Sequence, residues 1–277
     1  MKKKTGKRRL DSLLVERGLF ESREKAKPFI LAGKVEVGGR RHDKPGARVE
    51  ESAEISVRGG QRFVSRGGDK LDHALDAFGV DAAGKRCLDV GAAAGGFTDC
   101  LLKRGAVSVC ALDVGRGQIH PRLRSDPRVT VIERTNVRRV AADDFPHGFD
   151  LATVDVSFIS LRLVIPVVKG LLEPGGAIVA LVKPQFEAGR KNVVKGVVRD
   201  PAVHGEVLKS LKEFCAGLGL VTAGETESPL MGPKGNREFF LHLKQGGIPM
   251  SVNLTEHQIS NKEPKNVEGE RRRRRTS

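Results

Sequence analysis

The stretch LDVGAAAGGFTD, residues 88–99, decides the fold. It begins as a strand, passes through a glycine-rich turn and continues as a helix. Gly91, Gly95 and Gly96 allow the backbone to pass close to a ligand, because glycine has no Cβ. A strand, a glycine turn and a helix in this order are typical of the first cofactor-binding loop of an α/β sheet.

The spacing of the glycines restricts the ligand. GxxxGG is neither the dinucleotide pattern GxGxxG nor a P-loop, and the loop has no basic residue for a phosphate. A glycine turn without a phosphate partner suits S-adenosylmethionine. Asp113 follows 22 residues after Gly91 and ends the second strand, where a carboxylate can accept hydrogen bonds from both ribose hydroxyls. Asp113 could instead merely end a strand at a turn. This alternative is the weaker one, because the glycine turn and the strand-end carboxylate occur together.

Outward from this loop, strand and helix patterns alternate. Helical stretches separate the first five strands, so we predict an α/β fold with a doubly wound, seven-stranded, mostly parallel sheet. Ligands of such a sheet bind at the carboxyl ends of its strands. The predicted strands are 86–92, 107–114, 129–134, 149–158, 177–184, 221–227 and 238–244.

The N-terminal region has a different pattern and much of the charge. Residues 1–60 contain 16 Lys and Arg against 9 Asp and Glu, a net +7 of the total +15. This balance favours a polyanionic partner, nucleic acid first and an anionic membrane second. With no Trp or Tyr in the chain, base stacking would fall to Phe or Arg.

Local signals in this region predict a small α+β domain. A helix over 8–17 ends at Gly18, and a second helix runs from an N-cap at Ser22 to Gly33. A hairpin with a Gly-Gly turn and a closing strand follow. The arrangement resembles the small RNA-binding domain named after a ribosomal protein of the small subunit, although Pro28 departs from its pattern and is expected to kink the second helix. The alternative is a solvated basic domain without a specific ligand.

These patterns give the domain organisation. We predict an RNA-binding domain at 1–60, a linker at 61–66, an S-adenosylmethionine-binding domain at 67–245 and a basic, disordered tail at 246–277. The four cysteines have no zinc-binding spacing, so we expect reduced, buried thiols and no metal site. No apolar run is long enough to span a membrane and no secretory signal is present, which predicts a cytoplasmic protein.

Four charged residues lie where strands or the preceding helix meet the cleft. Lys183 closes the fifth strand immediately before Pro184, and Asp155 lies at the end of the fourth. In this fold we expect these two strands to flank the switch point of the sheet, with both side chains over the methyl group of the cofactor. Glu238 opens the last strand, and Lys70 lies on a helix before the first. Each could be an ordinary surface or strand-end charge, and Lys183 could extend to solvent.

Taken together, the motifs resemble the TlyA family of ribosomal RNA 2′-O-methyltransferases, some of which are called haemolysins. The matching motifs are SRGGDKL, GGFTD, VDVSFISL, LVKPQFEAG, GVVRDP and GPKGNREFF, within residues 8–243. The resemblance implies a Rossmann-like class I methyltransferase fold and a cytidine 2′-hydroxyl of 16S or 23S ribosomal RNA as target. It places the family's catalytic tetrad on Lys70, Asp155, Lys183 and Glu238.

The predicted cofactor is S-adenosylmethionine. The sequence departs from the family pattern in two places. The glycine loop has Ala93 and Ala94 where relatives often have hydroxyl residues, and the domain joint has Phe63 where relatives often have Trp. The partner is ribosomal RNA within a ribosomal subunit, and the oligomeric state is open, with a monomer favoured. The predicted cofactor-binding residues are Asp89, Gly91, Ala92, Gly95, Gly96, Phe97, Thr98, Asp113 and Asn136.

Two roles are open for Lys183. As a neutral amine it could accept the proton of the ribose hydroxyl, with Asp155 orienting it and Glu238 placing Lys70. As an ammonium it would instead hold the hydroxyl in line and stabilise the alkoxide. Two other functions also remain, a catalytically silent RNA-binding assembly factor and a membrane-active haemolysin. The intact tetrad argues against the first, and the lack of a broad amphipathic helix against the second.

Overall fold

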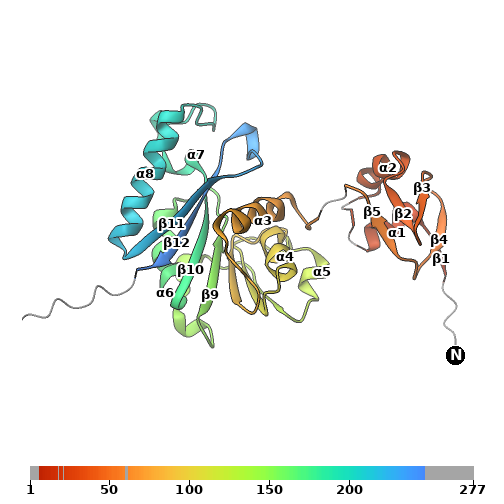
Figure 1. Ribbon diagram of the computed structural model, residues 1–277, viewed down its shortest axis with the longest axis horizontal. Helices are drawn as coiled ribbons and strands as arrows, with labels where there is room; N and C mark the ends of the chain where they lie inside the picture. The colour runs from red at the N-terminus through yellow and green to blue at the C-terminus, as the bar shows by residue number, and fades with distance from the viewer. Residues whose placement is uncertain (1–5, 18, 21, 60–61, 247–277) are drawn as a thin grey trace, which may run out of the picture. The chain divides into compact units, whose positions relative to one another are not determined.

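The computed structural model describes residues 6–17, 19–20, 22–59 and 62–246 (Figure 1). The predicted helix end at Gly18 lies outside the described residues, as does the predicted tail apart from Gly246. The N-terminal unit and the larger unit are described separately below.

The N-terminal unit packs two helices, α1 (Leu10–Glu16) and α2 (Arg23–Leu31), on short strands. Ser22 caps α2 by accepting a hydrogen bond from the Lys25 amide, as predicted, and the helix continues through Pro28. The core of the N-terminal unit consists of aliphatic side chains from both helices, β2 and β4. The strands form a β3-β2-β5 sheet and a β1-β4 pair, with bounds β1 (Lys7–Arg9), β2 (Val35–Val37), β3 (Arg40–His42), β4 (Arg48–Glu50) and β5 (Ile55–Val57).

The larger unit contains one seven-stranded sheet in the order β11-β12-β10-β9-β6-β7-β8. The six strands other than β12 run parallel, and β12 is antiparallel to both of its neighbours. All seven predicted strands are therefore confirmed. Their bounds are β6 (Arg86–Val90), β7 (Ser108–Leu112), β8 (Val129–Ile132), β9 (Phe149–Val154), β10 (Leu172–Val182), β11 (Leu220–Glu227) and β12 (Phe239–Gln245).

Helices cover both faces of this sheet (Figure 1). Successive residues of β7 and of the buried part of β10 alternate between two separate apolar cores, as the two-residue period of a strand requires. One core includes side chains of α3 (Arg66–Phe78), α4 (Gly96–Lys103) and α5 (Pro121–Arg124). The other includes α6 (Ile165–Gly170) and α8 (Pro201–Gly217), with α7 (Pro184–Glu187) next to α8.

Two details differ from the sequence expectations. The switch point lies between β6 and β9, because the chain proceeds to β7 and β8 on one side of β6 and to β10 on the other side of β9. It does not lie between the fourth and fifth strands, β9 and β10, as we expected. The connection from β8 to β9 contains only two short 3-10 turns, η1 (Val137–Arg139) and η2 (Ala142–Asp144).

The chain immediately before α3 packs onto the larger unit. Phe63 and Val64 are 4% and 9% exposed and belong to the same core as Leu71, so this half of the predicted linker is anchored. Ser65 caps α3 by accepting a hydrogen bond from the Gly67 amide. Within the described ranges, no helix is long and apolar enough to cross a membrane. All four cysteines are free and buried, and burial raises the pKa of Cys100 to about 12.

Candidate active site

The glycine loop joins β6 to α4, and its glycines admit other parts of the protein. Gly91 has φ +83, and a Cβ there would lie 2.3 Å from the carbonyl oxygen of Asp155. A Cβ on Gly96 would lie 2.2 Å from the Ser65 Oγ, and one on Gly95 would lie 2.3 Å from Leu123. These glycines bring the residue after β9, the N-cap of α3 and a side chain of α5 close to the loop. That they also make room for a ligand stays a prediction.

A buried polar network lies beneath the loop. Asp89 is fully buried, and its carboxylate accepts hydrogen bonds from Thr98 Oγ1 at 2.7 Å and from Thr153 Oγ1 at 3.2 Å. Burial is the main cause that raises the pKa of Asp89 to about 7, and the charge of Asp155 adds to it. The network ties β6 to α4 and β9, so it fixes the base of the loop.

A cavity of about 770 Å³ opens at the carboxyl ends of β6, β7 and β9. Asp113 forms part of its wall, with one carboxylate oxygen 2.8 Å from the Ala93 amide and the other 2.6 Å from the Gly115 amide. Apolar side chains make up much of the remaining wall. They are Val90, Leu112, Val114, Val137, Val156, Phe158, Ile159, Leu163 and Val164.

The structure separates the predicted cofactor residues into three groups. Gly91, Asp113 and Asn136 line the large cavity, together with the predicted catalytic Asp155. Ala92 lines a smaller hollow on the other side of Asp113. The remaining residues are buried beneath the loop or at the start of α4. These are Asp89, Gly95, Gly96, Phe97 and Thr98.

Lys183 lies at the edge of this cavity and is paired with two of its lining residues. Its Nζ atom is 2.5 Å from Asp155 Oδ1 and donates a hydrogen bond to Ser157 Oγ at 2.9 Å. Its side chain is 11% exposed, so it does not extend into solvent. Asp155 and Lys183 come together because β9 and β10 are parallel neighbours that both end here.

Lys70 and Glu238 form a second ion pair. Lys70 Nζ lies 2.6 Å from Glu238 Oε2, and the side chains are 13% and 1% exposed. Gly232 leaves room for this carboxylate, since a Cβ there would lie 2.0 Å from Glu238 Oε1. Among the described residues, this second oxygen has no hydrogen-bond partner. The four residues of the predicted tetrad thus form two lysine–carboxylate pairs, contributed by α3 and by the residues that directly flank β9, β10 and β12.

The sequence analysis missed three residues at this site. Ser157 bonds Lys183, Phe158 is 91% exposed with φ +63, and Glu187 bonds the loop after β9. The first two follow Asp155 within the motif VDVSFISL, and Glu187 lies in LVKPQFEAG. Their chemistry depends on how two loops meet in space, which the motifs alone do not specify.

The arrangement suits group transfer to a hydroxyl. It combines a cavity for a cofactor-sized ligand, a carboxylate on the wall, and the Lys183 ammonium paired with Asp155 at its edge. The Lys70–Glu238 pair lies one residue beyond the Val182–Phe239 pairing of β10 and β12. Such groups can orient a nucleophile and stabilise developing negative charge.

Comparison with known proteins identifies both units. Residues 63–245 match the FtsJ-like methyltransferase model, and residues 8–55 match the S4 domain model. Among solved structures, "Putative hemolysin from Streptococcus thermophilus" has a TM-score of 0.67 and 42% identity, covering 87% of this chain and 90% of that one.

Two curated relatives are similar over most of their length. The "Putative rRNA methyltransferase YqxC" of Bacillus subtilis is 52% identical over 244 residues, which is 87% of each chain. The "16S/23S rRNA (cytidine-2'-O)-methyltransferase TlyA" of Mycobacterium tuberculosis is 45% identical over 239 residues, covering 85% of this chain and 89% of the relative. The chain therefore belongs to the FtsJ-like methyltransferase family, and within it to the TlyA-type proteins that carry an S4 domain.

Proposed function

We propose that this protein transfers the methyl group of S-adenosylmethionine to the 2′-hydroxyl of a cytidine in ribosomal RNA. The observation that supports this most directly is the Lys183–Asp155 pair at the edge of the large cavity, accompanied by the buried Lys70–Glu238 pair. The named activity of the Mycobacterium tuberculosis relative supports the choice of cytidine and of 16S or 23S RNA.

The cavity fits S-adenosylmethionine, which supplies an electrophilic methyl group when bound. Its volume of about 770 Å³ is in the range of small-molecule sites, roughly 300–1,000 Å³. Each carboxylate oxygen of Asp113 accepts one backbone hydrogen bond and has a further lone pair. Asp113 can therefore accept hydrogen bonds from ribose hydroxyls, while the apolar wall suits an adenine ring. Gly91 and Asn136 would complete the contact surface.

The ribose hydroxyl would be oriented by Lys183. Methyl transfer requires that the oxygen be aligned with the methyl group and lose its proton as the bond forms. The ion pair with Asp155 suits a charged Lys183 that orients the oxygen, because accepting a proton would first require this pair to open. Glu238 holds Lys70, which adds a second positive charge to stabilise the developing alkoxide.

Phe158 is the proposed stacking surface for the target base. Its ring is 91% exposed and lies 5.1 Å from the ring of Phe186, and its backbone has φ +63. A non-glycine residue in this conformation costs on the order of 1–3 kcal/mol and is typical of functional sites. Stacking on an aromatic ring would hold an unpaired base beside Lys183.

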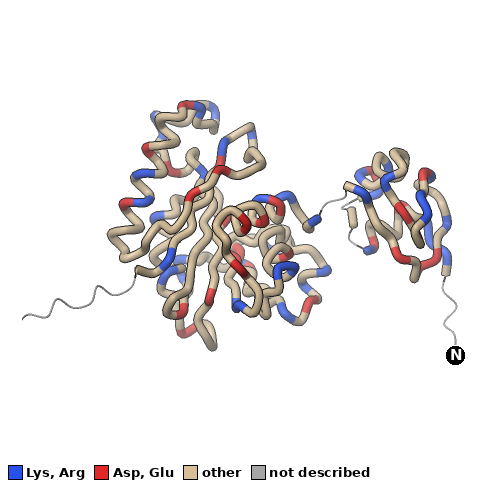
Figure 2. The backbone as a smooth tube through the Cα atoms, in the orientation of Figure 1, with Lys and Arg blue, Asp and Glu red and all other residues tan. Residues whose placement is uncertain are grey.

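We assign RNA recognition to residues 1–60 and catalysis to residues 67–245. Lys and Arg recur along the N-terminal unit (Figure 2), and phosphate contacts by such residues give affinity that falls steeply with salt. The S4 match at residues 8–55 supports this assignment.

The test is transfer of a labelled methyl group to ribosomal RNA, followed by mapping of 2′-O-methylation. Lys183→Ala should abolish transfer but leave cofactor and RNA binding within about fivefold, because an orienting group acts mainly in the transition state. Lys209→Ala, at an exposed position of α8, is the matched control and should retain wild-type activity. Lys183→Arg stays charged. Residual activity in it would indicate orientation, and its complete loss would indicate proton acceptance.

Two outcomes would contradict the proposal. Near wild-type transfer in Lys183→Ala would remove Lys183 from the chemistry. A wild-type protein that binds ribosomal RNA but never methylates it would be an RNA-binding assembly factor.

A further inference from the structure

The active-site lysine and aspartate lie beyond the end of the sheet. Pairing between β9 and β10 extends as far as Val154 and Ala180, while β10 continues to Val182 against β12 and the Asp155 amide donates a hydrogen bond to the Val90 carbonyl of β6. Asp155 begins the loop that leads to η3 (Leu161–Leu163), and Lys183 directly precedes α7. The sheet therefore fixes the backbone at Asp155 and just before Lys183, but not the rest of the loop after Asp155, whose Ser157 accepts a hydrogen bond from Lys183.

Glu187, the last residue of α7, makes such a contact with both of its carboxylate oxygens. Oε2 accepts a hydrogen bond from Ser160 Oγ at 2.6 Å, and Oε1 accepts one from the Leu161 amide at 2.7 Å. Burial raises the pKa of Glu187, and these two donors oppose that effect. Each carboxylate oxygen thus joins α7 to the far end of the loop that Asp155 begins.

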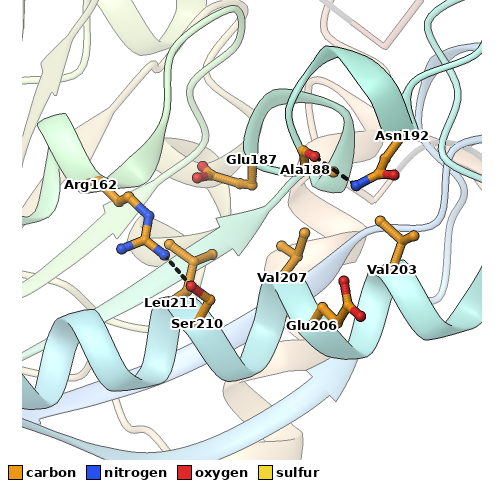
Figure 3. A pocket seen from close by; sticks show the side chains of 9 residues that line it. All are labelled: Arg162, Glu187, Ala188, Asn192, Val203, Glu206, Val207, Ser210 and Leu211. Carbon is orange, nitrogen blue, oxygen red and sulfur yellow. Dashed lines mark hydrogen bonds between the residues drawn. The ribbon is translucent and has the colours of Figure 1, made fainter.

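Figure 3 shows where this carboxylate lies. Glu187 projects from α7 over α8, above Val207 and Leu211, into a hollow of about 170 Å³. On the opposite side, Arg162 donates a hydrogen bond to Ser210 Oγ at 2.7 Å and lies over the Phe214 ring. Arg162 therefore holds η3 on α8, whereas Glu187 holds it on α7.

We propose that Glu187 is a positioning residue, whose carboxylate fastens the loop after β9 to α7 and thereby holds Ser157 where it orients Lys183 in its pair with Asp155. The inference rests on the proposed function, and Glu187 itself contacts neither the cavity nor the reacting groups. The loop needs such a restraint because Phe158, in its middle, has the left-handed φ of +63. A strained residue of this kind persists only where the surrounding structure holds it.

The alanine variant tests this directly. Glu187→Ala removes both hydrogen bonds, and a misplacement of about 1 Å at Lys183 should lower kcat by about 100-fold. The KM for ribosomal RNA and the affinity for S-adenosylmethionine should change by less than about fivefold. Glu206→Ala is the matched control, since Glu206 lines the same hollow from α8 but has an exposed side chain, and it should keep wild-type kcat.

The glutamine variant separates positioning from charge. In Glu187→Gln, the amide oxygen can accept from the Leu161 amide, and the NH₂ group can donate to Ser160, whose hydroxyl can also accept. Glu187→Gln should therefore recover kcat to within about tenfold of wild type. If the negative charge itself were required, Glu187→Gln would be as inactive as Glu187→Ala, and the proposal would be wrong.

A readout without catalysis keeps this test independent of the proposed function. Hydrogen exchange at the Leu161 amide should accelerate at least about tenfold in Glu187→Ala and stay slow in Glu187→Gln. Ser160→Ala should lower kcat less than Glu187→Ala, and the double variant should be no worse than Glu187→Ala alone. Unchanged exchange at Leu161, or wild-type kcat in Glu187→Ala, would overturn the inference. An inactive wild-type protein would instead refute the proposed function.

Discussion

Replacement of Lys70 should destabilise the protein much more than replacement of a surface lysine that lies equally close to its carboxylate partner. Lys70 lies 2.6 Å from Glu238 Oε2, and the Glu238 side chain is 1% exposed. In Lys70→Met the carboxylate would stay buried without a counter-charge, and breaking a buried pair in this way costs about 3–5 kcal/mol. Glu238→Gln should cost less, because Lys70 is 13% exposed and its long side chain can turn toward water.

The control is the Lys212–Glu225 pair. Its atoms are 2.8 Å apart, nearly the same distance, but its side chains are 40% and 36% exposed. Exposed pairs contribute about 0–1 kcal/mol, so Lys212→Met should change the free energy of unfolding by no more than that. The two lysine variants therefore differ in burial and not in bond length.

Urea unfolding of the full chain, followed by circular dichroism, measures these differences in the transition of the larger unit. The double variant Lys70→Met/Glu238→Gln should regain at least about 2 kcal/mol relative to Lys70→Met, because no uncompensated charge remains. It should nevertheless stay inactive in methyl transfer. The reasoning fails if Lys70→Met costs less than about 1 kcal/mol, or if the two single effects add in the double variant.

Three further predictions concern the loop, the core and the cavity. Burial raises the pKa of Asp89 to about 7, so the native state keeps a proton that the unfolded state releases near pH 4. The free energy of unfolding should therefore fall by up to about 4 kcal/mol from pH 4 to 7. Asp89→Asn should lose this pH dependence in urea titrations. Gly68→Ala should lower the free energy of unfolding by about 1–3 kcal/mol, because its Cβ would lie 2.2 Å from the Phe63 ring. Gly205→Ala, on α8 with open space around it, should instead raise it by about 0.5–1 kcal/mol. Thermal unfolding measures both, and equal effects would contradict this reasoning. Asp113→Ala should weaken S-adenosylmethionine binding about 10–100-fold in calorimetry, and unchanged affinity would exclude Asp113 from the ribose site.

The sheet could be predicted because its signals are local. Buried strands such as 86–92 and 177–184 are short apolar runs bounded by glycine, proline or charged residues. The three-residue strands β1 and β4 give no such signal. β1 consists of Lys7, Arg8 and Arg9, and β4 has a single buried residue, Val49. Their pairing depends on the fold of the whole N-terminal unit.

The site was predicted by residue type more readily than by environment. Lys70, Asp155, Lys183 and Glu238 could be chosen from their places at strand ends, but which lysine pairs with which carboxylate depends on the strand order. Spacing also could not show that Gly96 faces Ser65, because that contact joins residues that are distant in the chain. The role inferred for Glu187 is of the same kind.

The position of β12 affects when an active enzyme can first exist. This strand is the last of the sheet in sequence, yet it lies between β10 and β11, and it begins directly after Glu238, whose partner Lys70 is 168 residues earlier. Until residues 238–245 have been synthesised and inserted, the gap between β10 and β11 is open and Lys70 lacks its carboxylate. A nascent chain that is still growing toward residue 245 therefore has no assembled catalytic centre. Assembly of the catalytic pairs thus depends on the strand of the sheet that is synthesised last.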